Sequence, residues 1–311
     1  MTRIEQPLVS IITPTFNQAK FIAETIESVL TQTYPNIEYI ILDYGSTDET
    51  QQVLKEYGER ATIESQKNMG QARTLNKGWA MARGTYLAYL SSDDVLYPDA
   101  IARLVNALEA DPTRVCAFPD CDLIDEDSRV IKRNVCRPFD LCDLVVKQEC
   151  YIGPGELFRR DAFVKAGGWK PELRLAPDRE FWIRLATYGS FHFVDATLAG
   201  YRMHPRSISY SDVSEQTSME YLNVLDHYFA GHDIPPEIHS RKDEAYAHAL
   251  FILARNAFRS GRISRGAHFY GRACKLHPPL RGMGFKLRLA RQVVSKPARI
   301  ALHRIRSLVK G

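Results

Sequence analysis

The sequence predicts an α/β fold in which helices flank a mainly parallel β-sheet, with a helical extension at the C-terminal end. Three observations lead to this prediction. Short, nearly continuous apolar runs alternate with amphipathic stretches of helical period through the first 110 residues. Polar clusters follow three of the apolar runs, at residues 15–17, 43–48 and 91–94. Beyond residue 214 the recurring pattern is helical.

The first 110 residues contain the core of the predicted sheet. Strands covered on both faces read as continuous apolar runs, and such runs predict strands at residues 8–13, 37–43 and 85–90. The less apolar segment ATIES predicts a further strand at residues 61–65. Helical periodicity predicts helices at residues 19–32, 48–57, 70–82 and about 98–110. Ser46 or Thr47 is expected to cap the second helix, and Gly84 to end the third. Ligands of such sheets bind at the carboxyl ends of the strands, where the polar clusters lie.

The rest of the chain is less regular until its helical end. Short strands are expected near residues 115–118 and 192–195, and helices near 161–166 and 178–188. Two amphipathic helices, at about 241–259 and 263–275, bracket Gly261 like a helix–turn–helix unit. These patterns divide the chain into an α/β domain (1–212), a helical extension (213–275) and a basic amphipathic tail (276–311).

The charge of the chain is unevenly distributed. Its 311 residues carry 41 Lys and Arg against 37 Asp and Glu, for a net charge of +4. Residues 245–311 hold 15 of the cations and no acid, so the preceding body has a net charge of −11. A nucleic-acid enzyme more often spreads positive charge over its main domain, so no nucleic-acid partner is expected. The hydrophobic share of 45% argues against bulk disorder.

The sequence predicts a cytoplasmic protein with reduced cysteines. Its first residues contain no apolar segment ahead of a signal cleavage site, and no stretch reaches the ~18–20 apolar residues of a spanning helix. Five of the six cysteines fall between residues 116 and 150, without CxxC or zinc-finger spacing. Scattered buried thiols are the expected state, with a redox or metal cluster as the alternative.

Two adjacent acids, Asp93 and Asp94, end a predicted strand inside the segment YLSSDDVLYP. Adjacent carboxylates are costly to hold close together unless a positive charge neutralises them. Hard oxygen ligands of this kind suit Mg²⁺ or Mn²⁺ carrying a diphosphate. The alternative is that the two acids simply precede and cap the helix that begins at Pro98.

Seven segments follow one another in a definite order: VSIITPTFN, LDYGSTDET, MGQARTLNKGWAMARG, LSSDD, GELFRRDAFVKAGGW, PDREFWIRLATYG and YRMHPRSIS. Together, over about residues 7–210, they resemble the family 2 glycosyltransferases, which have the GT-A fold. The chain looks most like the soluble bacterial members that build surface polysaccharides and lipopolysaccharides. The QxxRW-type motif of the processive membrane synthases is absent.

The resemblance implies a nucleotide-sugar site at the strand ends. The residues that it assigns to the nucleoside pocket are Pro14, Thr15, Phe16, Asn17, Asp43 and Tyr44. Asp93 would face the ribose or the metal, and Asp94 would hold the Mn²⁺ or Mg²⁺ that bridges the diphosphate. Arg73 and Asn76 are assigned to the same donor, with a solvated helix face as the alternative for Arg73.

The resemblance also implies a catalytic base and a late diphosphate-binding element. Asp178 matches the carboxylate that deprotonates the acceptor, with a simple first-turn helix acid as the alternative and Glu180 as the second candidate. Arg202 and His204 match the YRxH element near the diphosphate. His204 could ligate the metal or be an ordinary hydrogen-bonded loop residue. Trp169 is expected to stack on an acceptor sugar.

Tyr44 departs from the family pattern. Many relatives have a second acid at this position, and that acid often reads a uracil ring. A tyrosine cannot accept a hydrogen bond from that ring as a carboxylate does, although it could stack on a base. Uridine as the nucleoside is therefore in question.

The basic tail is predicted to attach to an anionic membrane surface. Its second half places Ala301, Leu302, Ile305, Leu308 and Val309 on one helical face, and Arg299, His303, Arg306 and Lys310 on the other. This pattern is typical of interfacial helices. A solvated helix face is the alternative. Nucleic-acid binding is disfavoured because no base-stacking aromatics are interleaved with the tail cations.

The sequence therefore predicts a metal-dependent, inverting glycosyltransferase that moves a sugar from a nucleoside-diphosphate donor to a growing glycan or lipid-linked acceptor in cell-surface polysaccharide synthesis. Its expected location is cytoplasmic, at the inner face of the cell membrane. A non-catalytic nucleotide-sugar-binding or scaffold protein is the alternative. A sugar nucleotidyltransferase is disfavoured because the chain lacks a glycine-rich N-terminal loop.

Overall fold

The computed structural model describes residues 6–207 and 213–293, which divide into two compact units. The first unit takes the chain up to Phe139 together with Cys150–Met203. The second takes Asp140–Glu149 and the chain from His204 onward, so it includes a short segment from the middle of the sequence. Nothing in the local sequence of that segment indicates this. The domain boundaries expected at residues 212 and 275 stay predictions.

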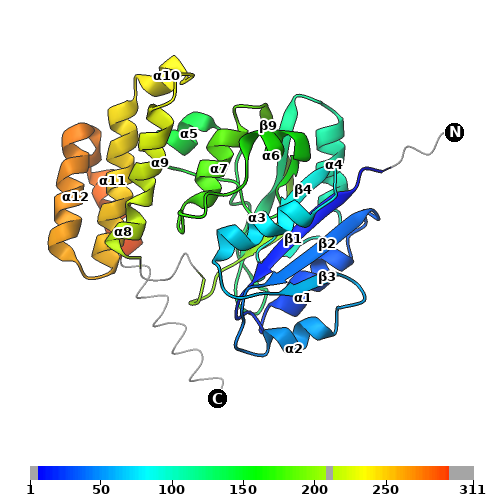
Figure 1. The fold of residues 1–311 in the computed structure, drawn as a ribbon. Helices are drawn as coiled ribbons and strands as arrows, with labels where there is room; N and C mark the ends of the chain where they lie inside the picture. Colours follow the sequence, from blue (N-terminus) through cyan, green and yellow to red (C-terminus); the bar gives the residue numbers. More distant parts are fainter. Residues whose placement is uncertain (1–5, 208–212, 294–311) are drawn as a thin grey trace. The chain divides into compact units, whose positions relative to one another are not determined.

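A nine-stranded sheet runs through the first unit (Figure 1). Its strands are β1 (Val9–Thr15), β2 (Ile37–Asp43), β3 (Thr62–Ser65), β4 (Tyr86–Tyr89), β5 (Val95–Leu96), β6 (Arg114–Ile124), β7 (Val130–Lys132), β8 (Leu157–Arg159) and β9 (Ser190–Arg202). Their order is β3-β2-β1-β4-β8-β6-β9-β5, with β7 paired to β6. The neighbours among β3, β2, β1 and β4 are parallel, as are β6 and β9, whereas β5, β7 and β8 run antiparallel to their partners. The predicted α/β class with a mainly parallel sheet is confirmed.

Strands β6 and β9 are much longer than the short runs expected from the sequence. Asp120 and Asp122 interrupt the apolar pattern of β6, although both are buried there. Asp120 Oδ1 accepts the N–H groups of Cys121 at 2.8 Å and Cys136 at 2.9 Å, which offsets the cost of burying the carboxylate. The polarity of these residues, satisfied only in the fold, hid the strand from the sequence pattern.

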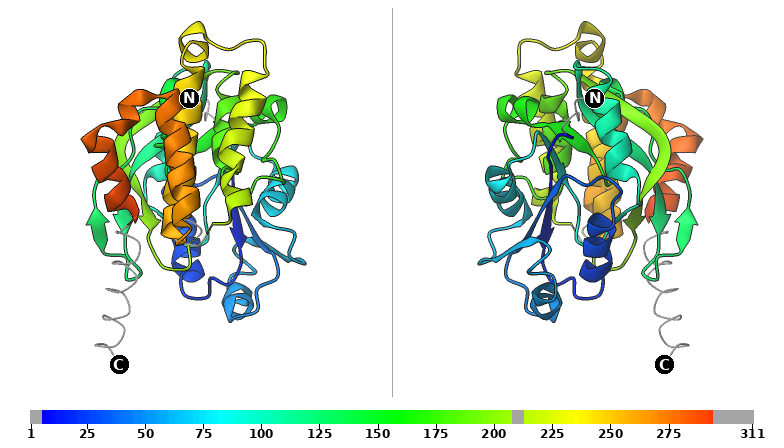
Figure 2. Two further views of the ribbon diagram at one scale, coloured as in Figure 1. Left: turned by 90° about the vertical axis from the view of Figure 1, so that its left-hand side faces the viewer. Right: turned by 90° about the vertical axis from the view of Figure 1, so that its right-hand side faces the viewer.

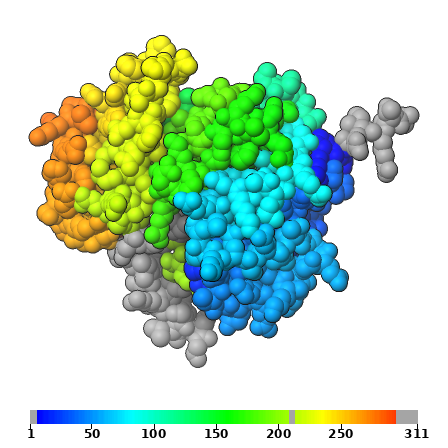
Figure 3. Space-filling view, in the orientation of Figure 1, coloured from blue at the N-terminus to red at the C-terminus, as the bar shows by residue number. Residues whose placement is uncertain are grey.

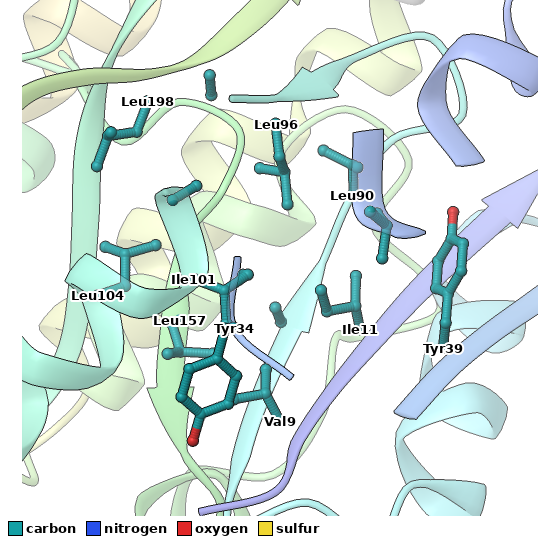
Figure 4. Close-up of a cluster of buried hydrophobic side chains, with 14 of the residues drawn as sticks. Val9, Ile11, Tyr34, Tyr39, Leu90, Leu96, Ile101, Leu104, Leu157 and Leu198 are labelled. Carbon is teal, nitrogen blue, oxygen red and sulfur yellow. The ribbon is translucent and has the colours of Figure 1, made fainter. Parts of the chain in front are cut away.

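Helices α1 (Ile22–Leu30), α2 (Thr50–Lys55) and α4 (Ala100–Glu109) cover one face of the sheet. Their apolar side chains pack on odd-numbered residues of β1 and β2, such as Val9, Ile11 and Ile41, because alternate residues of a strand share a face. Figure 4 shows part of this cluster, to which α4 contributes Ile101 and Leu104. Each fully buried side chain of this kind contributes ~1.5–3 kcal/mol, so the cluster holds these helices firmly to the sheet.

Helices α3 (Gln71–Met81), α6 (Arg160–Ala166) and α7 (Pro177–Leu185) cover the opposite face. Their packing is largely aromatic: the ring of Trp79 lies 5.7 Å from that of Phe158 and 5.9 Å from that of Phe181. Gly78 lets α3 approach the sheet closely, since a Cβ atom there would lie 2.5 Å from Ile12. This packing fixes α7, whose first turn carries the predicted catalytic base.

The second unit is helical. Its elements are α5 (Leu141–Val145), α8 (Glu215–Ser218), α9 (Glu220–Phe229), α10 (Pro236–His239), α11 (Lys242–Arg259), α12 (Ile263–Leu276) and the 3-10 turn η2 (Pro278–Arg281), with further helix at 283–293. Helices α9, α11 and α12 lie side by side (Figures 1 and 2). Gly261, with φ +73°, makes the turn between α11 and α12. The predicted C-terminal helical region is confirmed.

The helical packing continues beyond α12. Leu280 is fully buried, Leu289 is buried, and the ring of Phe285 lies 6.2 Å from that of Phe251 on α11. Residues 278–293 therefore pack as part of this unit, whereas the predicted amphipathic face at 299–310 lies outside the described residues. None of the helices formed by residues 6–207 and 213–293 has the length and apolar character that crossing a bilayer requires.

Gly78→Ala is expected to destabilise the first unit by about 1–3 kcal/mol, because the added methyl group presses on Ile12 between α3 and β1. Gly271→Ala on α12 is the control. Among the described residues no atom lies within 4 Å of that methyl group, so Ala should stabilise the helix by up to about 1 kcal/mol. Urea unfolding followed by circular dichroism measures both changes. Equal effects of the two substitutions would contradict the close approach of α3 to the sheet.

Candidate functional site

Three loops meet at the carboxyl ends of β1, β2 and β4. The strand register places Thr15 opposite Asp43 and Ile12 opposite Tyr89, so the three strands end along one edge of the sheet. The loops that follow contain the polar clusters at residues 15–17, 43–48 and 91–94. The three polar clusters that the sequence assigned to the nucleoside and the metal thus follow neighbouring strand ends.

Asn17 shapes the turn that follows β2. Its backbone has φ +54°, and its Oδ1 accepts the N–H of Thr47 at 2.8 Å and that of Asp48 at 3.4 Å. Its own N–H donates to Ser46 Oγ at 2.9 Å. Ser46 therefore accepts a hydrogen bond across the loop. The prediction that Ser46 or Thr47 caps helix α2 is wrong, because this helix has no side-chain cap within the described chain. Helix α2 begins at Thr50, whose N–H donates to Asp48 Oδ1 at 3.0 Å.

Asp43 is fully buried at the end of β2, where its Oδ2 accepts Gln51 Nε2 at 2.8 Å. The neighbouring ring of Tyr44 stacks on Phe16, with 5.3 Å between centroids and 18° between planes. Burial, and then the charges of Asp93 and Asp43, raise the pKa of Tyr44 to about 12. The phenol is therefore protonated at neutral pH, and it lies close to both acids.

Pro14 and Thr15 complete β1, and both are buried. Thr15 Oγ1 has no hydrogen-bond partner among the described residues. Leaving a buried polar group unpaired costs about 1–3 kcal/mol, and such groups in native proteins often await a ligand or water. This hydroxyl, one strand away from Asp43, marks a place where a polar group of a ligand could bind.

Asp93 and Asp94 follow β4 as predicted. Asp94 is 3% exposed; its Oδ1 accepts the backbone N–H of Arg202 at 2.8 Å, and its backbone oxygen accepts Thr25 Oγ1 at 2.8 Å. Burial, and then the charge of Asp93, raise the pKa of Asp94 well above its usual range. A cation would relieve this cost, and carboxylate oxygens are ligands that Mg²⁺ and Mn²⁺ prefer. The two acids therefore fit a divalent ion.

Arg202, at the end of β9, supports the acidic pair from within the protein. Its guanidinium is 0% exposed, and its Nε donates to the backbone oxygen of Asp93 at 2.7 Å. Nη1 donates to the backbone oxygen of Asp125 at 3.0 Å, and Nη2 forms a salt bridge with Glu24 at 2.7 Å. The guanidinium also lies over the ring of Phe21, 5.0 Å from its centroid. In the structure Arg202 is a positioning residue, and its contact with a diphosphate stays a prediction.

Asp178 lies in the first turn of α7 with its side chain half-buried. Burial of the carboxyl raises the pKa of Asp178, against the opposing effects of Arg179 and of backbone N–H groups at the helix start. Burial also raises the pKa of Tyr89 at the end of β4, and the charges of Glu156 and Asp178 add to that shift. The charge of Asp178 therefore acts on the end of β4.

Glu156 is a buried carboxyl that the sequence reasoning missed. It is 1% exposed and directly precedes β8, whose Leu157 pairs with Ala88 of β4. Burial raises the pKa of Glu156 well above its usual range, and the charges of Asp178 and Asp94 contribute. Its Oε1 lacks a hydrogen-bond partner in the part of the chain that the structure describes. The available signal was a glutamate directly before the apolar pair Leu157 and Phe158.

Glu180, the second candidate base, is engaged in ion pairs. Its two carboxylate oxygens accept Nε and Nη2 of Arg184, each at 2.7 Å, and one lies 3.0 Å from Lys170 Nζ. Both oxygens of this carboxylate are occupied by hydrogen bonds from cations, so they are less available to the hydroxyl of an acceptor. The geometry therefore favours Asp178 over Glu180.

Asn76 and Trp169 hold each other. Asn76 Oδ1 accepts the N–H of Trp169 at 2.8 Å, and its Nδ2 donates to the Trp169 backbone oxygen at 2.7 Å. Trp169 is 4% exposed and packs edge-on against Tyr89 at 5.2 Å, so its ring is part of the core instead of an open platform for an acceptor sugar. Arg73 is exposed in the first turn of α3, a helix that forms part of the surface (cyan in Figure 3). The donor contacts of Asn76 and Arg73 stay predictions.

His204 begins the second unit, whereas Asp93 and Asp94 lie in the first. Its backbone oxygen accepts the N–H of Ser207 at 3.1 Å and Ser207 Oγ at 2.5 Å. This turn closes locally, and the assignment of His204 to the metal stays a prediction.

The first unit thus combines three chemical capabilities. The acidic pair of Asp93 and the buried Asp94 suits a divalent ion. The unpaired Thr15 hydroxyl and the stacked rings of Phe16 and Tyr44 lie at the adjacent strand ends. The carboxyl of Asp178, whose pKa is raised, can take up a proton. Residues with perturbed pKa values beside a ligand site are typical of catalytic centres.

The amino-acid sequence is similar to known proteins across this region. The profile of the family described as Glycosyl transferase family 2 matches residues 10–167. An uncharacterized glycosyltransferase of Rickettsia prowazekii (strain Madrid E) is 31% identical over 232 residues, covering 72% of this chain and 70% of that protein. The chondroitin synthase of Escherichia coli is 28% identical over 223 residues, covering 70% of this chain and 32% of that longer protein.

Solved structures share the fold. A mannosyltransferase of Pyrobaculum calidifontis, PcManGT, in complex with GDP-Man and Mn²⁺, gives a TM-score of 0.63 at 17% identity, covering 95% of this chain and 87% of that one. Residues 1–349 of S. aureus TarS, in complex with UDP-GlcNAc, give a TM-score of 0.59 at 15% identity, over 88% of this chain and 91% of that one. At such low identity the likeness shows the fold alone, and it is the GT-A fold expected from the sequence.

Arg202→Met is expected to destabilise the first unit by about 3 kcal/mol or more, because it leaves buried backbone oxygens of Asp93 and Asp125 without their donor. Arg129→Met is the matched control. Arg129 pairs with Asp127 at the surface with 70% of its side chain exposed, so its loss should change stability by less than about 1 kcal/mol. Thermal and urea unfolding measure both variants. If Arg202→Met is as harmless as the control, the positioning role of Arg202 is wrong.

Proposed function

The chain belongs to glycosyl transferase family 2 and is a glycosyltransferase, and we propose that it is a metal-dependent, inverting enzyme that uses a nucleoside-diphosphate sugar. One observation carries this proposal: the loops with Asp43 and with Asp93 and Asp94 follow strands that end along one edge of the sheet, and the charge of Asp178 acts on Tyr89 at that edge. Glycosyl transfer needs stabilisation of the leaving group and a base at the acceptor. Asp93 and Asp94 would serve the leaving group through the metal, and Asp178 would serve as the base at the acceptor.

The pocket residues of β1 and β2 support a nucleotide donor. The unpaired hydroxyl of Thr15 and the buried carboxylate of Asp43 offer polar contacts, while the Phe16 and Tyr44 rings offer an aromatic surface. Two proteins of the same fold were solved with nucleotide sugars, GDP-Man and UDP-GlcNAc, which supports this class of donor. The protonated Tyr44 phenol can donate a hydrogen bond where many relatives have an acid that accepts one.

Asp94 and Asp93 would hold the Mn²⁺ or Mg²⁺ ion. When bound, such an ion stabilises the negative charge that develops on the diphosphate. The chain's own contribution is to keep the acids in place. The guanidinium of Arg202 donates to the backbone oxygen of Asp93, and the backbone N–H of Arg202 donates to Asp94 Oδ1, so these two hydrogen bonds fix the loop that carries both acids.

Asp178 would act as the catalytic base. It would take the proton of the acceptor hydroxyl while that oxygen bonds to the anomeric carbon and the bond from this carbon to the diphosphate oxygen breaks. Attack from the face opposite the leaving group inverts the configuration of the sugar. Glu180 is less suited to this role, since Arg184 and Lys170 hold its carboxylate.

The acceptor is a growing glycan or a lipid-linked sugar in polysaccharide synthesis, and the relative named chondroitin synthase supports this context. A lipid-linked acceptor would place the enzyme at the inner face of the cell membrane. Helix 283–293 exposes Met283 (69%) and Leu287 (62%), which are one turn apart on the same face. Lys286 and Arg291 on the same helix are also exposed. Exposed apolar residues among cations suit an anionic membrane surface.

Asp178→Asn is expected to lower the transfer rate by about 10²–10⁴-fold, because the amide cannot accept the acceptor's proton. Nucleotide binding in the presence of Mn²⁺ should be retained, since Asp178 is not one of the acids at the diphosphate. A thermal-shift screen of nucleoside-diphosphate sugars identifies the donor, and release of nucleoside diphosphate then measures turnover. In the wild type, transfer should decline as pH falls through the raised pKa of Asp178, at a higher pH than for an exposed aspartate.

Asp161→Asn is the matched control, because Asp161 is also a first-turn acid, on α6, and its side chain is exposed. It should leave both binding and turnover unchanged. Unchanged turnover in Asp178→Asn would overturn the assignment of the base, and loss of nucleotide binding would show that Asp178 belongs to the donor site.

Removing residues 294–311 is expected to weaken binding to anionic vesicles at least 100-fold, because five Lys and Arg are lost and each contributes about 1 kcal/mol near such a surface. A cut at residue 276 would also remove the buried Leu280, so the shorter deletion is the cleaner test. Vesicle sedimentation measures binding, with neutral vesicles as the control. Activity on a soluble acceptor should survive. Full vesicle binding by the truncated chain would sink the membrane proposal.

A further inference from the structure

Three metal-ligating side chains gather in the helical unit, apart from the acidic pair of the sheet: Glu244, His248 and His277. Their ligand atoms all lie within 4.8 Å of one another, and all three side chains are half-buried. Glu244 and His248 are four residues apart on α11, so they share one face of the helix. His277 directly follows α12 and comes from a different part of the chain.

One hydrogen bond defines the tautomer of the His248 imidazole. Its Nδ1 lies 2.9 Å from the backbone oxygen of Val146, which can only accept a hydrogen bond, so Nδ1 carries the proton. Nε2 therefore keeps its lone pair for a ligand. Metal-binding histidines characteristically donate their second ring N–H to a carbonyl or carboxylate in this way. The ring of His277 is 5.6 Å from that of His248 between centroids.

The charges around the cluster allow a cation. Arg241 donates Nε and Nη2 to the two oxygens of Glu244, each at 2.8 Å, and each oxygen keeps a second lone pair. Arg288, the other cation near His248, pairs with Glu149 at 2.7 Å. Each arginine is thus matched by a carboxylate, and the two imidazoles can bind as neutral ligands.

We propose that Glu244, His248 and His277 bind one divalent transition-metal ion of the zinc class, with water completing the coordination. Two imidazole nitrogens and one carboxylate oxygen are a donor set that suits Zn²⁺, whereas Mg²⁺ takes oxygen ligands almost exclusively. The half-buried site admits both the ion and a water. The bound ion ties α11 to the segment after α12, so it stabilises the helical unit.

Zinc binding by the full chain tests this, after residual metal is removed with a chelator. Zn²⁺ titration by calorimetry should show one tight site, and Co²⁺ should give the visible absorption of a four-coordinate centre. Zn²⁺ should also raise the melting temperature of the protein. His248→Ala, His277→Ala and the near-isosteric Glu244→Gln should each weaken Zn²⁺ binding at least tenfold and abolish the Co²⁺ spectrum. Circular dichroism checks that each variant is folded.

Two controls locate the site. His268→Ala changes an exposed histidine of α12 outside the cluster and should leave Zn²⁺ affinity unchanged. Asp94→Asn should also leave it unchanged, because the acidic pair of the sheet is a separate site. The proposal is overturned if the wild type binds Zn²⁺ no more tightly than the folded His248→Ala variant. It is equally overturned if Zn²⁺ binding is lost with Asp94→Asn, or if equimolar Mg²⁺ displaces the zinc.

Discussion

The acidic site depends on the buried guanidinium of Arg202. Removing a cation from water costs several kcal/mol, and here the cost is offset by hydrogen bonds to the backbone oxygens of Asp93 and Asp125, the ion pair with Glu24, and the face of Phe21. The hydrogen bonds of the guanidinium join β9, helix α1, the Asp125 turn and the loop after β4. Because the guanidinium holds the backbone oxygen of Asp93, it fixes the loop that carries the acidic pair.

The region around the strand ends carries an electrostatic cost that a ligand would relieve. Asp94, Glu156 and Asp178 all have raised pKa values, first because they are buried and, for Asp94 and Glu156, also because of neighbouring acids. A fold selected only for stability would avoid burying several carboxyls close together, so the electrostatic cost of burying them indicates a functional site. A bound divalent cation would offset the negative charge of the acidic pair and of the diphosphate, whereas Asp178 would remain able to take up a proton. The net negative charge of residues 1–244 thus includes carboxylates to which separate roles are proposed, in metal binding and in proton transfer.

Strands β1, β2 and β4 were predictable, because strands buried on both faces leave continuous apolar runs in the sequence. Other features were misread where a side chain acts across the fold. Gly84 was expected to end α3, but the helix ends at Met81, and Gly84 is needed because a Cβ atom there would lie 2.6 Å from the backbone of Ser10. Trp169 looked like a sugar platform and is a core residue. Glu156 was overlooked because its burial beside β4 depends on the antiparallel strand β8.

The sequence by itself determined strands β1, β2 and β4, the polar loops at their carboxyl ends and the acids in those loops, because hydrophobic periodicity and motif order are local properties. Only the tertiary structure decided which of those groups act together. Arg202 meets Glu24 across 178 positions of the chain, and no local pattern contains that contact. The same holds in the helical unit. The four-residue spacing of Glu244 and His248 can be read from the sequence, but the position of His277 beside them cannot. These contacts depend on long-range packing, because packing places side by side residues that are far apart in the sequence.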